Sequence, residues 1–255
     1  MRVLVKFMYL GPLFTGFQRG NGVNSVEDRI ISILQGRSLG NYVQAAARTD
    51  RNVSAADNAF TIDTQDDPEK VIRILNSEIE GMYFHSFAAV DDNFRARYSD
   101  SKTYSYLIFE KLDIDRLNAE LKKFTGTHDF TRFSRRDYRN PVRTINSIST
   151  LENDRWIEVN FTARSFVWNQ IRYIMGYVLE ALKTGTDIDP FDSAKEKPKL
   201  APPENLILSR ITYSGVKFQV ICQKSKLKRL LMDRSRYFAM AETVNKLLSE
   251  THKEK

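Results

Sequence analysis

Residues that bind metals or form disulfides are scarce in this sequence. Its 255 residues include one cysteine and three histidines, which are isolated from one another. A single cysteine excludes an internal disulfide framework and a cysteine-rich zinc or iron–sulfur site. Isolated histidines argue against a His-ligated metal centre. We therefore expect a protein without a metal.

Long apolar runs are also missing. No stretch approaches the roughly 20 apolar residues that span a membrane. The N-terminal segment is interrupted by charge at Arg2 and Lys6, and it reads as a strand and not as a signal peptide. We expect a cytoplasmic protein with no membrane-spanning segment.

Basic residues are in excess. The chain has 39 Lys and Arg against 32 Asp and Glu, a net charge of +7, which favours a polyanionic partner. Much of the excess lies between Lys217 and Arg236, where seven basic residues accompany one acid, Asp233. This stretch is either a phosphate-contacting face or an ordinary soluble helix surface.

Apolar periodicity predicts a mixed α and β chain. We expect helices that begin near Ser25 and Asp67 and over 113–123 and 166–183. The predicted strands cover residues 2–9, 42–47, 55–62, 82–90, 103–109, 145–151, 156–163 and 206–213. The order predicts an α+β fold with two α/β lobes, 1–110 and 111–215, on a mostly antiparallel sheet, and a basic helical tail over 216–255.

A polar loop between two predicted strands places an acid between two arginines, Arg48-Thr49-Asp50-Arg51. One interpretation is a solvated turn in which Asp50 caps the backbone. The other is a carboxylate that nearby guanidinium groups keep ionised, which suits nucleophilic or base chemistry.

The predicted helix over 166–183 carries an arginine on a largely apolar circumference. Arg172 lies beside Trp168 and Met175, and a buried arginine needs a carboxylate or phosphate partner. A structural ion pair would satisfy it. In the functional alternative, the partner is the acid of an active site.

Two further segments mix aromatic and polar side chains. The run from Thr131 to Arg143 has five arginines against one aspartate, with Phe133 and Tyr138 between them, which is typical of an RNA surface. The segment 102–106 places Tyr104 and Tyr106 on one face of a strand, where tyrosines usually belong to the core.

Short segments along most of the chain together resemble the tRNA pseudouridine synthase A family. The resemblance rests on eight of them in order: Tyr9 to Gln18, Ser25-Val26-Glu27, Arg48-Thr49-Asp50, Phe94 to Tyr98, Lys102 to Tyr106, Gly126 to Phe133, Phe161 to Gly176, and Ala201 to Leu208. Each piece is weak by itself, but eight in the right order are a strong signal.

The resemblance implies two ferredoxin-like lobes that share a central sheet, with an active-site cleft between them. It implies a homodimer that binds tRNA and isomerises uridine to pseudouridine in the anticodon stem-loop, without a cofactor. Asp50 would be the catalytic aspartate, acting on the ribose either as nucleophile or as base. Tyr104 would lie against the uracil, and Arg172 would pair with Asp50.

The expected substrate contacts follow from the same resemblance and from the arginine-rich run. Arg48 would hold the flipped-out nucleotide, and Arg97 would contact phosphate. Tyr106, Arg132, Arg135 and Arg136 complete the expected set.

The chain departs from the family pattern close to the aspartate. Ala47, Asn52 and Ser54 replace residues that the family keeps as glycine, glycine and histidine. Asn tolerates a left-handed backbone, so Asn52 can still make the turn. Arg95 and Leu10 are further departures. The alternatives to tRNA isomerisation are a noncatalytic RNA-binding or RNA-chaperone protein on this fold and the same reaction on another structured RNA.

Overall fold

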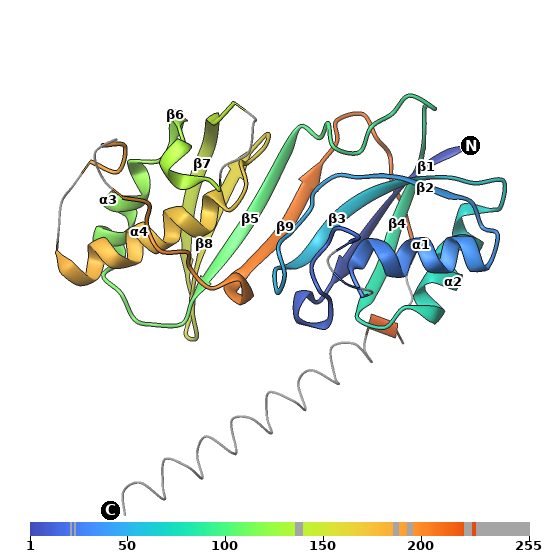
Figure 1. The fold of residues 1–255 in the computed structure, drawn as a ribbon, viewed down its shortest axis with the longest axis horizontal. Helices are drawn as coiled ribbons and strands as arrows, with labels where there is room; N and C mark the ends of the chain where they lie inside the picture. Colours follow the sequence, from blue (N-terminus) through green and yellow to red (C-terminus); the bar gives the residue numbers. More distant parts are fainter. Residues whose placement is uncertain are drawn as a thin grey trace, which may run out of the picture.

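The computed structural model describes residues 1–20, 22, 24–135, 140–185, 189–192, 196–221 and 226–227. One large sheet runs the length of the molecule (Figure 1). In spatial order its strands are β10 (Gln219–Val220), β4 (Met82–Val90), β1 (Arg2–Tyr9), β3 (Ser54–Asp63), β9 (Leu206–Thr212), β5 (Ser101–Ile108), β8 (Ile157–Ala163), β7 (Val142–Glu152) and β6 (Gly126–Asp129), while β2 (Asn41–Ala45) pairs with β3.

The pairings confirm the predicted mostly antiparallel sheet in an α+β fold. Every pairing among the described strands is antiparallel except that of β3 with β9. β1 alternates as its sequence predicts, with Val3, Val5, Phe7 and Tyr9 buried.

Among the described residues, four α-helices pack near the two ends of this sheet. α1 (Val26–Gly36) and α2 (Pro68–Glu78) lie at the end formed by β1 to β4, and α3 (Ile114–Lys122) and α4 (Gln170–Thr184) lie at the end formed by β6 to β8 (Figure 1). The predicted N-caps are confirmed, because Ser25 and Asp67 each accept hydrogen bonds from backbone N–H groups of the first turn.

Two hydrophobic cores divide the molecule into two lobes. The first contains the apolar face of β1 with residues of α1 and α2, and the second contains β8 with residues of α3 and α4. The predicted boundary at residue 110 leaves β5 with the first lobe, whereas Tyr106 and Ile108 of this strand pack in the second core.

The sheet forks at β3. The first residues of this strand, Ser54 and Ala55, pair with β9 of the central sheet, whereas the stretch from Phe60 to Asp63 pairs with β2. The loop over 46–53 connects β2 to β3 at this fork. It is therefore held at the place where the two lobes join.

Two local predictions differ from the structure. α4 begins at Gln170 and not at Phe166, because Asn169 has a left-handed backbone (φ 65°) that a helix cannot continue through. In the tail, which we predicted to be helical over 216–255, residues 219–220 form β10, whereas 226–227 are helical and the rest of 222–255 lies outside the described residues. No helix among the described ranges is long and apolar enough to cross a membrane.

Candidate active site

Asp50 and Arg172 form an ion pair that joins the two lobes. The Nη1 atom of Arg172 donates to Oδ2 of Asp50 at 3.1 Å. The Asp50 side chain is 28% exposed and that of Arg172 is 13% exposed. The arginine thus has the carboxylate partner that its apolar helix required, and the carboxylate keeps access to solvent.

Two hydrogen bonds and one close packing contact hold the loop that carries Asp50. The hydroxyl groups of Tyr9 and Thr49 lie 2.8 Å apart, and the N–H of Phe17 donates to the Thr49 carbonyl at 3.2 Å. Gly11 packs so tightly against the loop that an added Cβ would lie 2.4 Å from the Val53 carbonyl. β1 and the turn that follows it therefore fix the position of Asp50.

The turn after Asp50 needs a left-handed residue. Asn52 has φ 70°, which confirms that asparagine replaces the family's glycine in this backbone conformation. Its Nδ2 atom donates to Oε1 of Glu204 at 2.6 Å. The loop is thereby linked to the segment that precedes β9.

Arg172 is positioned by the chain that runs toward β9. Its Nε donates to the Ala201 carbonyl at 2.9 Å, and the Ala201 N–H donates to the Arg172 carbonyl at 3.0 Å. This segment approaches α4 closely at Gly176, where an added Cβ would lie 1.8 Å from the Lys199 oxygen. Gly176 therefore permits the contact that orients the guanidinium group.

Trp168 is a site residue that the sequence analysis missed. Its indole N–H donates to Oδ1 of Asp50 at 3.0 Å, so each carboxylate oxygen accepts one hydrogen bond from this segment. The sequence places Trp168 beside Arg172 on the helix predicted over 166–183, which gives no reason to assign it to a site. Asn169 could have indicated a turn there, because asparagine is common both at helix N-caps and in left-handed positions.

Tyr104 lies where the two cores meet, packed against residues of both. Its ring meets that of Phe166 edge to face, with centroids 5.4 Å apart. Burial raises the pKa of Tyr104 well above its ordinary value, and the nearby Tyr9 and the negative charge of Asp50 raise it further. The phenol therefore keeps its proton at neutral pH.

Lys102 is a buried cation on the same strand. Its Nζ donates to the Ala46 carbonyl at 2.8 Å, four residues before Asp50. Burial lowers the pKa of Lys102 to about 8. The contact ties β5 to the beginning of the Asp50 loop.

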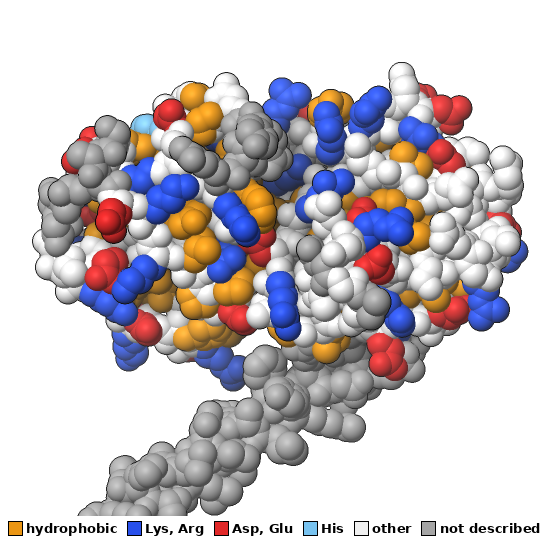
Figure 2. All heavy atoms as spheres, in the orientation of Figure 1, with side chains coloured by type: hydrophobic (Ala, Val, Ile, Leu, Met, Phe, Trp, Pro, Cys, Tyr) orange, Lys and Arg blue, Asp and Glu red, His pale blue; other side chains and the backbone are white. Residues whose placement is uncertain are grey.

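Three of the expected substrate-binding arginines are exposed. They are Arg48, Arg97 and Arg135. The Arg97 guanidinium lies 4.6 Å from the ring centre of Tyr98, and that of Arg135 lies 4.3 Å from the ring of Trp168. Lys and Arg side chains gather over the middle of the face shown in Figure 2, where the two lobes meet in Figure 1.

Other expected substrate contacts are placed differently. The guanidinium of Arg132 donates to the backbone carbonyls of Pro190 and Glu196, at 2.6 and 2.9 Å. These N–H groups are therefore bonded within the protein and not directed at a substrate. Tyr106 is 1% exposed in the second core, and burial raises its pKa to about 12. Arg136 lies outside the described residues.

The remaining departures from the family pattern have structural uses. The buried Ala47 accepts a hydrogen bond at its carbonyl from Asn58, and Ser54 Oγ accepts one from the Gly11 N–H. The Leu10 N–H donates to the Gly81 carbonyl. Arg95 is exposed.

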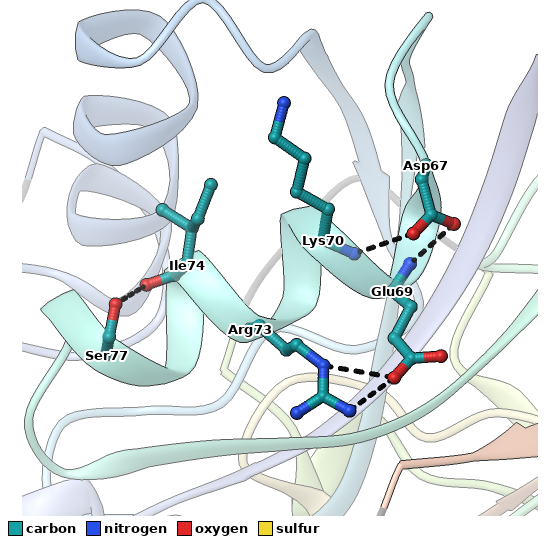
Figure 3. Close-up of a pocket in the computed structure, with 6 residues that line it drawn as sticks. All are labelled: Asp67, Glu69, Lys70, Arg73, Ile74 and Ser77. Carbon is teal, nitrogen blue, oxygen red and sulfur yellow. Dashed lines mark hydrogen bonds and ion pairs between the residues drawn. The ribbon is translucent and has the colours of Figure 1, made fainter.

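An open pocket on α2 lies apart from these residues (Figure 3). Its charged side chains pair with one another: Arg73 binds Glu69, and Lys70 binds Asp66 outside the pocket. Within the described residues, no group of three or more His, Cys, Asp and Glu is arranged so that it could hold a metal ion. The Asp50–Arg172 pair therefore remains the candidate site.

Comparison with known proteins gives the same family along nearly the whole chain. A protein from Thermoplasma volcanium named tRNA pseudouridine synthase A is 42% identical over 90% of this chain and 92% of its own. One of the same name from Thermoplasma acidophilum is 45% identical over 85% of each chain. The chain belongs to the tRNA pseudouridine synthase A family. The family described as tRNA pseudouridine synthase also matches residues 121–214 directly.

Membership in this family makes the chain an isomerase that converts uridine to pseudouridine, as the resemblance implied. Among solved structures, a Cbf5–Nop10–Gar1 complex aligns with a TM-score of 0.44 and 13% identity, over 81% of this chain and 48% of that chain. This distant likeness adds nothing to the assignment.

Proposed function

We propose that this chain isomerises uridine in the anticodon stem-loop of tRNA, with Asp50 as the acting carboxylate and with no cofactor. The observation that carries the proposal is the Asp50–Arg172 ion pair, which puts a partly exposed carboxylate at the junction of the lobes. The relatives named tRNA pseudouridine synthase A support tRNA as the substrate.

The reaction needs a carboxylate that stays ionised while the glycosidic bond breaks. Arg172 and Trp168 each donate to one oxygen of Asp50, so each oxygen of the carboxylate has a charged or polar donor. The ionised carboxylate either attacks C1′ or removes a proton from the ribose. Both routes break the bond from C1′ to N1 and let the uracil turn. When the bond from C1′ to C5 forms, it displaces the Asp50 carboxylate from C1′ in the first route, and in the second route Asp50 returns its proton to the ribose.

Proton transfer completes the isomerisation. The proton on C5 leaves, N1 gains one, and the product has the same atoms as the substrate. Tyr104 keeps its phenolic proton because burial raises its pKa, so it can donate a hydrogen bond to the base or pass on a proton. We assign it this role beside the reacting uracil.

The reacting nucleotide must leave its stack to reach Asp50. Arg48 is exposed and two residues from Asp50, which suits it to hold the flipped nucleotide. Arg97 and Arg135 each lie against an exposed aromatic ring, and their exposed guanidinium groups suit them to bind phosphate. We leave Tyr106 and Arg132 out of this contact set because their groups are buried or bonded within the protein.

We also propose that two copies of the chain bind one tRNA as a homodimer in the cytoplasm. The motivation is the family resemblance. Light scattering of the purified protein at micromolar concentration tests it. A single species with the mass of one 29.6 kDa chain, with or without tRNA, would contradict the dimer.

The deciding experiment follows the proton on C5. Unmodified tRNA transcripts carrying tritium at uridine C5 release tritium to water when pseudouridine forms. We expect release with the wild-type protein and none above background with Asp50→Ala. Equal release by both proteins would remove Asp50 from the mechanism.

The alternatives give different results in the same assay. Release from other structured RNAs but from no tRNA would favour the same reaction on another substrate. Tight tRNA binding without release from any RNA would favour a noncatalytic RNA-binding or chaperone protein. Mapping pseudouridine in tRNA from cells with and without the protein then locates the modified uridines and tests the anticodon stem-loop.

A further inference from the structure

We propose that Trp168 is a positioning residue for the Asp50 carboxylate, a role that rests on the proposed function of this site. The indole N–H donates to Oδ1 at 3.0 Å, while Arg172 donates to Oδ2 at 3.1 Å. Each oxygen is thus bound by a donor from the same stretch of chain at the start of α4. Two donors on two oxygens restrain rotation of the carboxylate, which Arg172 alone would leave free to turn.

The surroundings of Trp168 do not fit an ordinary core role. The residue is 39% exposed, although indole is one of the largest apolar side chains. Trp168 and the left-handed Asn169 form a turn before α4, closed by a hydrogen bond from the Gln170 N–H to the Val167 carbonyl, and the indole points toward the Asp50 loop. The indole is therefore oriented toward the carboxylate, although this leaves much of its apolar surface exposed to solvent.

Arg135 orients the indole from the solvent side. The Arg135 guanidinium lies 4.3 Å from the centre of the indole ring, and the Arg135 backbone N–H donates to the Trp168 carbonyl at 2.9 Å. Arg135 is exposed, so an RNA phosphate can reach the charge that holds the ring in place. The contacts form a continuous path from the RNA-binding surface through Trp168 to Asp50.

The chain offers a matched control at its other tryptophan. Trp156 is half-buried, and its indole N–H has no hydrogen-bond partner among the residues that the structure describes. Trp168→Phe and Trp156→Phe therefore make the same chemical change, but only the first removes a donor from Asp50. In Trp168→Phe the benzyl ring can still lie beneath Arg135.

Steady-state kinetics with tritiated tRNA gives the first readout. We expect Trp168→Phe to lower kcat about tenfold with KM unchanged, the loss for one hydrogen bond to a charged group. Trp156→Phe should match the wild type in both kcat and KM.

Two kinetic outcomes would overturn the proposal. The first is a wild-type kcat in Trp168→Phe. The second is a higher KM with unchanged kcat, because that pattern assigns Trp168 to RNA binding instead. A wild-type protein that releases no tritium from any RNA would instead overturn the proposed function.

Fluorescence tests the contact without any activity. The sequence has two tryptophans, so Trp168 is the sole emitter in Trp156→Phe. We expect its emission maximum to shift in the Trp156→Phe, Asp50→Ala double variant, because the carboxylate that accepts from the indole is then missing. An emission spectrum that Asp50→Ala leaves unchanged would overturn the positioning role even in an inactive protein.

Discussion

Arg172 donates to Asp50 across 122 positions of sequence, and the same guanidinium donates to the carbonyl of Ala201. One side chain thus connects the loop of the first lobe, the helix of the second and the segment that leads into β9. The pair is only partly screened by water, since the arginine is largely buried. Its removal should affect both the chemistry and the junction of the lobes.

Arg172→Lys should lower kcat at least a hundredfold, because a single ammonium cannot donate to both Asp50 and Ala201 in the geometry of a guanidinium. Tritium release from labelled tRNA measures the loss. A kcat within threefold of the wild type would show that the pair is structural, and the thermal midpoint of the same variant would then report its contribution to stability.

Gly176→Ala should destabilise the protein by more than about 2 kcal/mol, because the new Cβ would overlap the Lys199 carbonyl and push away the segment that holds Arg172. Urea unfolding measures the change. The matched control is Gly36→Ala in α1, where an added Cβ meets nothing within 4 Å. That variant should gain roughly 0.5–1 kcal/mol, as glycine to alanine usually does in a helix.

Asn52→Ala should cost about 1–2 kcal/mol, because alanine is strained at φ 70° and loses the hydrogen bond to Glu204. Asn52→Gly separates the two effects, since glycine accepts the backbone conformation but also lacks the amide. We expect the glycine variant to retain most of the stability in thermal unfolding. Equal losses in both variants would assign the cost to the Glu204 contact.

Stability should depend on pH through Lys102. Its pKa is about 8 in the folded protein and 10.5 ordinarily, so between these values the unfolded chain binds more protons. Stability from this group therefore rises with pH, by about 1.5 kcal/mol between pH 8 and 9.5. Above that range, the raised pKa values of buried Tyr9 and Tyr104 act in the opposite direction.

Lys102→Met provides the comparison. Urea unfolding of both proteins at pH 8 and 9.5 should show the rise in the wild type and a flatter response in the variant. The same rise in both proteins would exclude Lys102 as its source.

Binding of tRNA should weaken steeply with salt, because each neutralised phosphate releases counterions. Arg48→Gln should reduce the slope of log Kd against log salt by about 1. Arg73→Gln on α2 is the control, since that guanidinium pairs with Glu69 and we place no RNA there. Filter binding at several salt concentrations measures both slopes, and an unchanged slope for Arg48→Gln would remove this contact.

Much of the fold follows from local rules that the sequence displays. Alternation in β1, the caps at Ser25 and Asp67 and the turn at Asn52 each depend on neighbouring residues, and the structure agrees with them. The beginning of α4 does not follow, because helical periodicity continues through Phe166 to Trp168 although Asn169 is left-handed. A single backbone angle decided which direction Trp168 faces.

Some residues of the candidate site could likewise be identified from the sequence, and others only from the structure. The sequence by itself determined the family and proposed Asp50, Tyr104 and Arg172, because short motifs retain their residue types and order along the chain. Only the tertiary structure decided that Trp168 binds Asp50, that Arg132 binds backbone carbonyls and that Tyr106 is buried. These contacts join segments far apart in sequence, and whether a side chain faces a carboxylate, a carbonyl or the core is set by packing between the lobes.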